Sequence, residues 1–208
     1  MELFADRDEA GRRLAERLPD ARDPLVLALP RGGVAVAAPV ARRLGAALDV
    51  LVTRKIGHPA QPELGVGAIA EGGEPVFDLG LLRRLGMTPE SVAEVVELER
   101  RELARRVRAY RGDRPLPPLA GREVVVVDDG LATGGTARAA LRAVAAARPA
   151  RVTLAVPVGA RDTVESMRRE ADEVVALLTP VDFRAVGQWY EHFEQLTDAD
   201  VLKLLERP

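Results

Sequence analysis

Cysteine is absent from the 208-residue sequence, which excludes a disulfide framework, a thiolate metal site and a cysteine nucleophile. Histidine occurs only at positions 58 and 192, and one residue at each place does not make a metal site. No apolar run is long enough to span a bilayer, and the acidic start of the chain lacks the apolar core of a signal peptide. We therefore expect a cytoplasmic protein with no membrane partner.

A dominant charge of one sign is also missing, because 30 Lys and Arg residues are balanced by 32 Asp and Glu residues. The net charge of −2 provides no basic field that would favour nucleic acid or an anionic membrane as a partner. The hydrophobic fraction of 47% is sufficient for a well-formed core. A chain of this length and composition predicts a single domain over residues 1–208.

The chain is organised around residues 124–136. Four valines in a row, residues 124–127, are apolar on both faces and predict a strand buried in a parallel sheet. Asp128 and Asp129 end this strand, a loop rich in Gly and Thr follows, and residues 137–144 predict a helix. The loop therefore leads from two carboxylates into the N-terminus of a helix.

This order of elements suits a sugar phosphate. Free backbone N–H groups, two threonine hydroxyls and the helix dipole can surround one phosphate, and glycine lets the backbone approach it closely. Carboxylates one step before the loop can accept hydrogen bonds from vicinal sugar hydroxyls, or hold Mg²⁺ through water. A strand ending in two aspartates also resembles a Walker B strand or a receiver-domain acidic pocket, but no P-loop sequence accompanies it here.

The stretch VVVVDDGLATGGT at 124–136 resembles the phosphoribosyl pyrophosphate (PRPP) signature of the type I phosphoribosyltransferases. The resemblance implies that Asp128 and Asp129 contact the ribose hydroxyls, with Mg²⁺ held indirectly through the ribose or through water. It implies a 5′-phosphate site formed by Leu131, Ala132, Thr133, Gly134, Gly135 and Thr136. The implied fold is α/β, an open twisted, mainly parallel sheet flanked by helices, with a flexible flap and a small C-terminal hood. A homodimer is also implied.

A second glycine-containing turn follows the first predicted sheet strand, residues 25–29. It consists of Pro30, Arg31, Gly32 and Gly33. Ligands gather at the carboxyl ends of strands in open α/β sheets, and an arginine there offers a planar cation suited to phosphate. By resemblance this turn is the pyrophosphate loop, and the alternative is a tight turn with a surface arginine. The helix that follows ends near residue 44, and Pro39 either kinks it or marks its start.

A basic residue after the second predicted strand, residues 48–52, is another candidate for binding the diphosphate. Lys55 is favoured and Arg54 is the reserve, while the alternative is a solvated basic turn.

Residues 56–75 are dense in Gly and Pro, and they predict a loop, a short strand at 66–70 and a turn at Gly72 and Gly73. By resemblance the segment at about 54–76 is a flap that closes over the reaction centre and excludes water. His58 within it is a weak catalytic candidate.

Thr88 and Pro89 predict the start of a helix that ends by Gly112. Its outer face carries both Glu and Arg, and the simpler interpretation is a solvated face with i,i+4 ion pairs. The alternative is an RNA-binding face, which the interleaved acidic residues disfavour. That face would be centred on Arg100, Arg101, Arg105, Arg106 and Arg108.

The remaining pattern predicts a helix at residues 6–18, strands at 152–156 and 174–178, and a helix at about 161–171 between those strands. Repeated strand–helix units indicate a parallel sheet with right-handed crossovers. The core would then span about residues 20–180.

The hood, about residues 180–208, holds the only Trp of a chain in which aromatic residues make up just 3%. A planar base needs a surface to stack on, and Phe183 is the candidate, with Trp189 as the alternative. Equally, these aromatics pack a C-terminal helix onto the core. Thr197 and Asp198 would cap that helix. Its expected inner face consists of Val201, Leu202 and Leu205.

These features together predict Mg²⁺-dependent transfer of the phosphoribosyl group from PRPP to a nucleobase, with a purine favoured, and release of pyrophosphate. The residues expected to carry catalysis are Asp128, Asp129, Arg31 and Lys55. The alternative is a PRPP-sensing regulatory protein of the same fold that binds RNA, DNA or a protein. A PRPP synthetase-like enzyme is disfavoured, because the chain is too short for two domains and lacks an evident ATP site.

Overall fold

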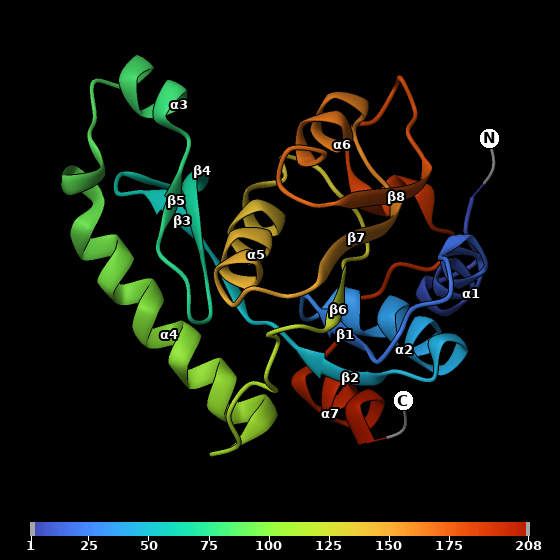
Figure 1. The fold of residues 1–208 in the computed structure, drawn as a ribbon. Coiled ribbons are helices and arrows are strands. Elements are labelled where there is room, and N and C mark those ends of the chain that lie inside the picture. Colours follow the sequence, from blue (N-terminus) through green and yellow to red (C-terminus); the bar gives the residue numbers. More distant parts are fainter. Residues whose placement is uncertain (1–2, 207–208) are drawn as a thin grey trace.

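The structure, a computed structural model, describes residues 3–206. Its centre is a five-stranded sheet in the order β2-β1-β6-β7-β8, in which every neighbouring pair is parallel (Figure 1). The α/β fold with an open, mainly parallel sheet is therefore confirmed. The strands are β1 (Pro24–Ala28), β2 (Ala47–Val50), β6 (Glu123–Val127), β7 (Arg151–Val158) and β8 (Glu173–Leu178).

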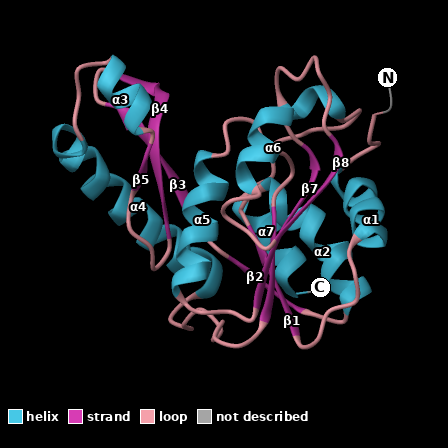
Figure 2. Cartoon of the chain, turned by 45° about the horizontal axis from the view of Figure 1, so that its top comes forward, coloured by secondary structure: helices cyan, strands magenta, loops and turns pink. Residues whose placement is uncertain are grey.

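Helices cover both faces of this sheet. Helices α1 (Arg7–Arg17) and α2 (Gly32–Leu44) lie on one face, and α5 (Gly135–Ala146) and α6 (Arg161–Met167) lie on the other (Figure 2). In β6, Val125 and Val127 belong to the buried cluster that contains α1 and α2 residues, whereas Val124 and Val126 belong to the cluster of α5 and α6. A strand with two covered faces must be apolar at every position, which is why β6 is a run of valines.

Residues 53–111 form an arm beside the sheet, on the left in Figure 1. Its elements are β3 (Thr53–His58), β4 (Gln61–Ala70), β5 (Val76–Phe77), α3 (Leu79–Arg84), the 3₁₀ helix η1 (Pro89–Val92) and α4 (Ala93–Arg111). Strand β4 packs on α5 through a small cluster in which Ala68, Ala70 and Ala139 are buried. Short side chains on both elements let the two backbones approach closely.

The expected loop within residues 56–65 is wrong, because this segment forms an antiparallel hairpin of β3 and β4. The pairing runs from Thr53 with Ala70 to His58 with Gln61, with irregular register around Gly57. Hydrogen bonds across the hairpin satisfy the backbone, so a composition typical of loops still forms strands. The predicted turn is confirmed at Gly72, whose φ is +72°.

Of the two alternatives for Pro39, the structure excludes the helix start, because α2 begins at Gly32 and Pro39 lies inside it. Two further details differ from expectation. The helix expected from residue 88 begins as η1 and becomes α-helical only at Ala93. In α7 (Asp198–Glu206), Val201 is fully buried, but Leu202 is 38% exposed and is not part of the inner face.

A buried arginine joins the arm to the sheet. Only 1% of the Arg111 side chain, at the end of α4, is exposed, and its Nη1 donates to the Val50 carbonyl oxygen at 3.1 Å. It pairs with Asp49 at 3.5 Å and with Glu71. Burial raises the pKa of Glu71, and the charge of Arg111 opposes that rise. The guanidinium therefore compensates two carboxylates that the fold removes from water.

Replacing Arg111 tests this junction. Arg111→Met keeps much of the volume but leaves Asp49 and Glu71 without their cation, so we expect the free energy of unfolding to fall by about 3–5 kcal/mol. Urea denaturation measures the change. The control is Arg108→Met, an exposed residue of the same helix, which should alter stability by about 0.5 kcal/mol or less. Equal losses in the two variants would show that the buried charge cluster is not what secures the arm.

Candidate functional site

Two loops meet at the carboxyl ends of the neighbouring strands β1 and β6. Parallel pairing aligns Ala28 with Val127, and the Leu29 N–H donates to the Val127 carbonyl oxygen at 2.8 Å. The turn at residues 30–33 therefore lies directly beside Asp128 and Asp129. The peptide bond between Pro30 and Arg31 is cis.

Glycine is required in this turn because of how closely it approaches the acidic pair. A methyl group on Gly32 would overlap the Asp129 carboxylate. One on Gly33 would lie 2.7 Å from the Val127 carbonyl oxygen and 3.1 Å from the Asp128 Cα. The structure thus brings together the two motifs that the sequence placed about a hundred residues apart.

The loop at residues 131–136 has an anchored backbone and free N–H groups. The Leu131 N–H donates to the Val158 carbonyl oxygen at 2.9 Å, and the Thr163 hydroxyl donates to the Ala132 carbonyl oxygen at 2.7 Å. Gly134, with φ of +75°, is the N-cap of the 12-residue helix α5. Among residues 3–206, no partner accepts a hydrogen bond from the N–H groups of residues 132–136. This arrangement can bind an anion at the helix N-terminus.

Burial and mutual repulsion disfavour a negative charge on both members of the acidic pair. Burial raises the pKa of Asp128, and the neighbouring charge of Asp129 raises it further. Burial also raises the pKa of Asp129, although Arg7 opposes that rise. The Asp129 N–H donates to Asp128 Oδ1 at 2.8 Å, which orients the first carboxylate. Two carboxylates held together away from water suit a ligand that brings hydroxyl donors or a cation.

Arg7 and Tyr190 contact the acidic pair, and sequence reasoning missed both. The Arg7 Nε donates to Asp129 Oδ2 at 2.8 Å, and the Tyr190 hydroxyl donates to the Asp129 carbonyl oxygen at 2.6 Å. Arg7 lies 122 residues from its partner and belongs to no motif, so the sequence carried no signal for it. Tyr190 stands within the aromatic part of the hood, which was a weak signal.

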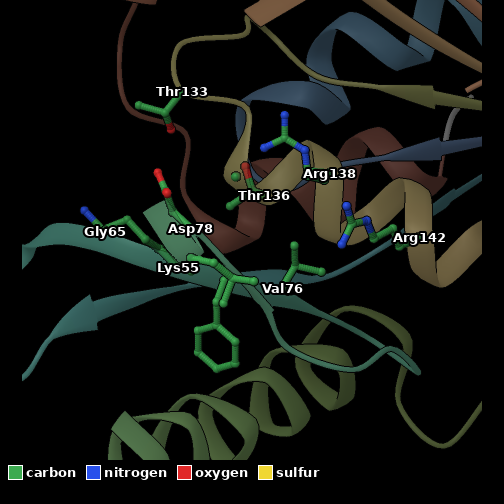
Figure 3. A pocket seen from close by; sticks show the side chains of 12 residues that line it. Lys55, Gly65, Val76, Asp78, Thr133, Thr136, Arg138 and Arg142 are labelled. Atoms are coloured by element: carbon green, nitrogen blue, oxygen red, sulfur yellow. The ribbon is translucent and has the colours of Figure 1, made fainter. Parts of the chain in front are cut away.

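A cleft of about 590 Å³ opens between the arm and α5 (Figure 3). Lys55, Thr133, Thr136, Arg138 and Arg142 contribute to its lining. In Figure 3 the Lys55 side chain lies along the arm, and its amine extends away from Arg138 and Arg142 of α5. Its Nζ donates to the Glu63 carbonyl oxygen at 2.7 Å. Lys55 thus lines the same cleft as Thr133 and Thr136 of the loop at residues 131–136.

Arg54 has a different environment from Lys55. Adjacent residues of a strand point to opposite faces, and the Arg54 Nε donates to Glu99 of α4 at 2.6 Å. Arg31 also makes a contact away from the acidic pair, because its Nη1 lies 3.9 Å from Asp198 of α7. That carboxylate accepts a hydrogen bond from the Tyr110 hydroxyl at 2.6 Å, and burial together with this bond raises the pKa of Tyr110 to about 12.

The two aromatic candidates of the hood differ in exposure. Trp189, at the end of the 3₁₀ helix η2 (Val186–Trp189), is 5% exposed and packs in a cluster with Phe4 and Tyr190. Phe183 is half-buried and lines a hollow of about 240 Å³ with residues 160–162, 180 and 181. A methyl group on Gly130 would overlap the Val186 side chain, so the hood packs directly on the acidic loop.

Ion pairs occupy much of the outer face of α4. Arg105 and Arg106 both donate to Glu102, which lowers the pKa of that carboxyl to about 2. Arg100 pairs with Glu74 at 3.2 Å. Over residues 3–206, no cluster of three or more His, Asp or Glu side chains is arranged to hold a metal ion. In the same range, no helix has the length and apolarity needed to cross a membrane.

Comparison with known proteins gives consistent matches. The family model described as "Phosphoribosyl transferase domain" matches residues 6–188. Two Mycobacterium tuberculosis proteins, from strains CDC 1551 and H37Rv, are provisionally named phosphoribosyl transferases and are 47% identical over 209 residues. The alignment covers 100% of this chain but 47% of each relative, so the chain spans about half the length of the curated relatives it matches.

Solved structures show the same fold. The crystal structure of TT1426 from Thermus thermophilus has 46% identity and a TM-score of 0.82, covering 99% of this chain and 98% of that one. A hypothetical protein from Neisseria gonorrhoeae with bound ppGpp has 14% identity and a TM-score of 0.52, covering 99% and 96%. The second likeness concerns the fold alone.

The raised pKa of Asp128 predicts a pH-dependent stability in the absence of ligand. The folded state retains a proton that the unfolded state releases near pH 4, so the free energy of unfolding should fall as pH rises from about 4 through the folded-state pKa. Asp128→Asn keeps the Oδ1 acceptor and removes the charge. Near neutral pH we expect the free energy of unfolding of this variant to be about 1 kcal/mol higher than that of the wild type. The difference between the two proteins should become smaller as the pH falls.

Urea denaturation across this pH range measures the effect. The control is Asp20→Asn, because the Asp20 side chain is 92% exposed and should show no such gain. An Asp128→Asn variant less stable than the wild type at neutral pH would contradict the electrostatic account.

Proposed function

The chain belongs to the phosphoribosyl transferase family, and from this premise we propose that it transfers the phosphoribosyl group of PRPP to a nucleobase, a purine being favoured, with release of pyrophosphate. One observation carries the proposal. The acidic pair, the glycine turn and the phosphate loop meet at the carboxyl ends of β1 and β6. Ligands of open α/β sheets bind at this edge.

Each of these three parts binds a different portion of PRPP, the donor substrate. The N–H groups of residues 132–136 and the hydroxyls of Thr133 and Thr136 hold the 5′-phosphate. Asp128 and Asp129 accept hydrogen bonds from the ribose hydroxyls and fix the sugar while the bond to the leaving group loosens. The transition state resembles that of glycoside cleavage, with positive charge on the sugar, and nearby carboxylates favour it.

The leaving pyrophosphate gains negative charge, which cations and free N–H groups stabilise. The turn at residues 30–33 offers its backbone and Arg31, while Lys55 approaches from the arm. The Arg31 Nη1 lies 3.9 Å from Asp198, and a turn of this side chain would bring its charge towards an anion at the glycine turn. Closure of the flap, about residues 54–76, would bring Lys55 over the reaction centre.

Magnesium fits the donor set of the site. Asp128 and Asp129 supply hard carboxylate oxygens, which suit this ion. No third acidic residue joins them in a metal-binding cluster within residues 3–206, so the remaining ligands would be water and PRPP oxygens. When bound, Mg²⁺ neutralises charge on the diphosphate. We further propose a homodimer and a role in nucleotide salvage from the family resemblance, and a cytoplasmic location from the composition of the sequence.

Phe183 is the proposed stacking partner of the acceptor base. It lines a hollow with residues 160–162, 180 and 181, whereas Trp189 is 5% exposed and packs in a buried cluster. An aromatic ring over a planar base is favourable by stacking. In the absence of turnover, the alternative role as a PRPP-sensing regulator would use the same donor site.

Pyrophosphate release tests the proposal. With PRPP and Mg²⁺, a panel of purine and pyrimidine bases should include one that supports release, and Asp128→Asn/Asp129→Asn should lower the rate by a factor of about 100 or more. Asp20→Asn, on the exposed surface, is the matched control and should keep wild-type activity.

Thermal stabilisation by PRPP in the same samples separates the alternatives. Stabilisation without turnover on any base would favour the regulator. If PRPP produced neither thermal stabilisation nor turnover, the proposed PRPP site would be refuted.

Substitutions of two neighbouring residues of β3 test whether the charge of Lys55 acts on PRPP. Lys55→Ala should lower kcat/KM for PRPP by about 100-fold, because it removes a cation facing the phosphates. Arg54→Ala, whose partner is Glu99, should leave kcat/KM close to the wild-type value although it lowers stability. Steady-state kinetics with varied PRPP measures both. Equal losses of kcat/KM would show that the whole arm, and not Lys55, acts on the donor.

A further inference from the structure

Arg7 is a largely shielded cation that joins the acidic pair to the hood. Its side chain is 11% exposed, and its Nε donates to Asp129 Oδ2 at 2.8 Å. Its Nη1 donates to the Glu194 carbonyl oxygen at 2.9 Å, and its Cζ lies 3.8 Å from the centre of the Phe193 ring. A guanidinium held by a carboxylate, a carbonyl and an aromatic face has one defined orientation.

This guanidinium also borders the glycine turn. A methyl group on Gly32 would lie 3.0 Å from the Arg7 Nε and would overlap the Asp129 carboxylate. The turn, the arginine and the carboxylate therefore occupy one tightly packed space. None of the three can move without disturbing the other two.

Arg7 contacts one of the two oxygens of the Asp129 carboxylate, Oδ2. The Asp128 side chain also interacts with the Asp129 side chain, so this carboxylate is held between a cation and a second carboxyl group. The positive charge of Arg7 also offsets part of the repulsion between Asp129 and Asp128.

The N-terminal segment and the hood reach Asp129 together. The Phe4 N–H donates to the Trp189 carbonyl oxygen at 2.9 Å, and the Glu191 N–H donates to the Phe4 carbonyl oxygen at 2.8 Å. Tyr190 of the same hood segment donates to the Asp129 backbone at 2.6 Å. The acidic residue is therefore connected by side chain and by backbone to the segment that would cover the acceptor.

We propose that Arg7 is a positioning residue for phosphoribosyl transfer, which orients the Asp129 carboxylate towards the ribose hydroxyls and couples it to the hood. The inference rests on the proposed function. Arg7 acts through Asp129, so substituting Arg7 should no longer affect PRPP binding or kcat/KM once the Asp129 carboxylate is absent.

A double-mutant cycle tests this dependence. Arg7→Gln should weaken PRPP binding and lower kcat/KM by about 10–100-fold, because partners that orient functional groups have effects of this size. Asp129→Asn should have an effect at least as large, and Arg7→Gln/Asp129→Asn should be no worse than Asp129→Asn alone. Calorimetric titration with PRPP and steady-state kinetics measure the four proteins.

Two further variants complete the design. Arg7→Lys keeps the charge but loses the planar guanidinium, so it should recover only part of the lost affinity. It also replaces Arg7→Gln in the cycle if that variant does not fold. Arg12→Gln, on an exposed side of the same helix, should bind PRPP as the wild type does, since Arg12 is 64% exposed and pairs only with Asp8.

The outcomes distinguish the inference from the function on which it rests. Wild-type affinity in Arg7→Gln, or losses from Arg7→Gln and Asp129→Asn that multiply in the double variant, would overturn the positioning role while PRPP binding stands. Failure of the wild-type protein itself to bind PRPP would overturn the proposed function, and the inference with it.

Discussion

Two adjacent carboxylates at the carboxyl end of β6 impose the constraint on which the rest of the site depends. Asp128 and Asp129 lie against the turn after β1, and they fit there only because residues 32 and 33 lack side chains. The parallel register of the two strands sets this approach, since it aligns Ala28 with Val127. Sheet pairing, turn composition and the placement of charge are thus parts of a single arrangement.

The same arrangement stores unfavourable electrostatic energy in the free protein. Burial and mutual repulsion raise the pKa of Asp128, and Arg7 offsets only part of the charge on its neighbour. Groups kept in such a state are common where a ligand later supplies what they lack. Here the missing partners would be hydroxyl donors and a cation, which a sugar diphosphate with Mg²⁺ provides. The chemistry of the proposed ligand therefore complements the electrostatics of the acidic pair.

The arm is positioned by packing of a different kind. Small side chains bring β4 close to α5, while Arg111 links the end of α4 to the sheet through two buried carboxylates. Lys55 lines a cleft together with the loop at residues 131–136, while Arg54 is turned towards α4. Strand alternation thus gives the two basic residues different surroundings, with Lys55 at the cleft and Arg54 paired with Glu99.

The sequence by itself determined the features whose causes are local: the buried valine strand, the acidic pair, the Gly- and Thr-rich loop that leads into a helix, and the glycine turn after the first strand. Tertiary structure alone decided the hairpin at residues 53–70, the burial of Trp189 and the contact of Arg7 with Asp129. Local patterns arise from neighbouring residues, so they are visible in one short window. Pairing across a sheet and a salt bridge over 122 positions depend on the whole folded chain, and no short window contains them.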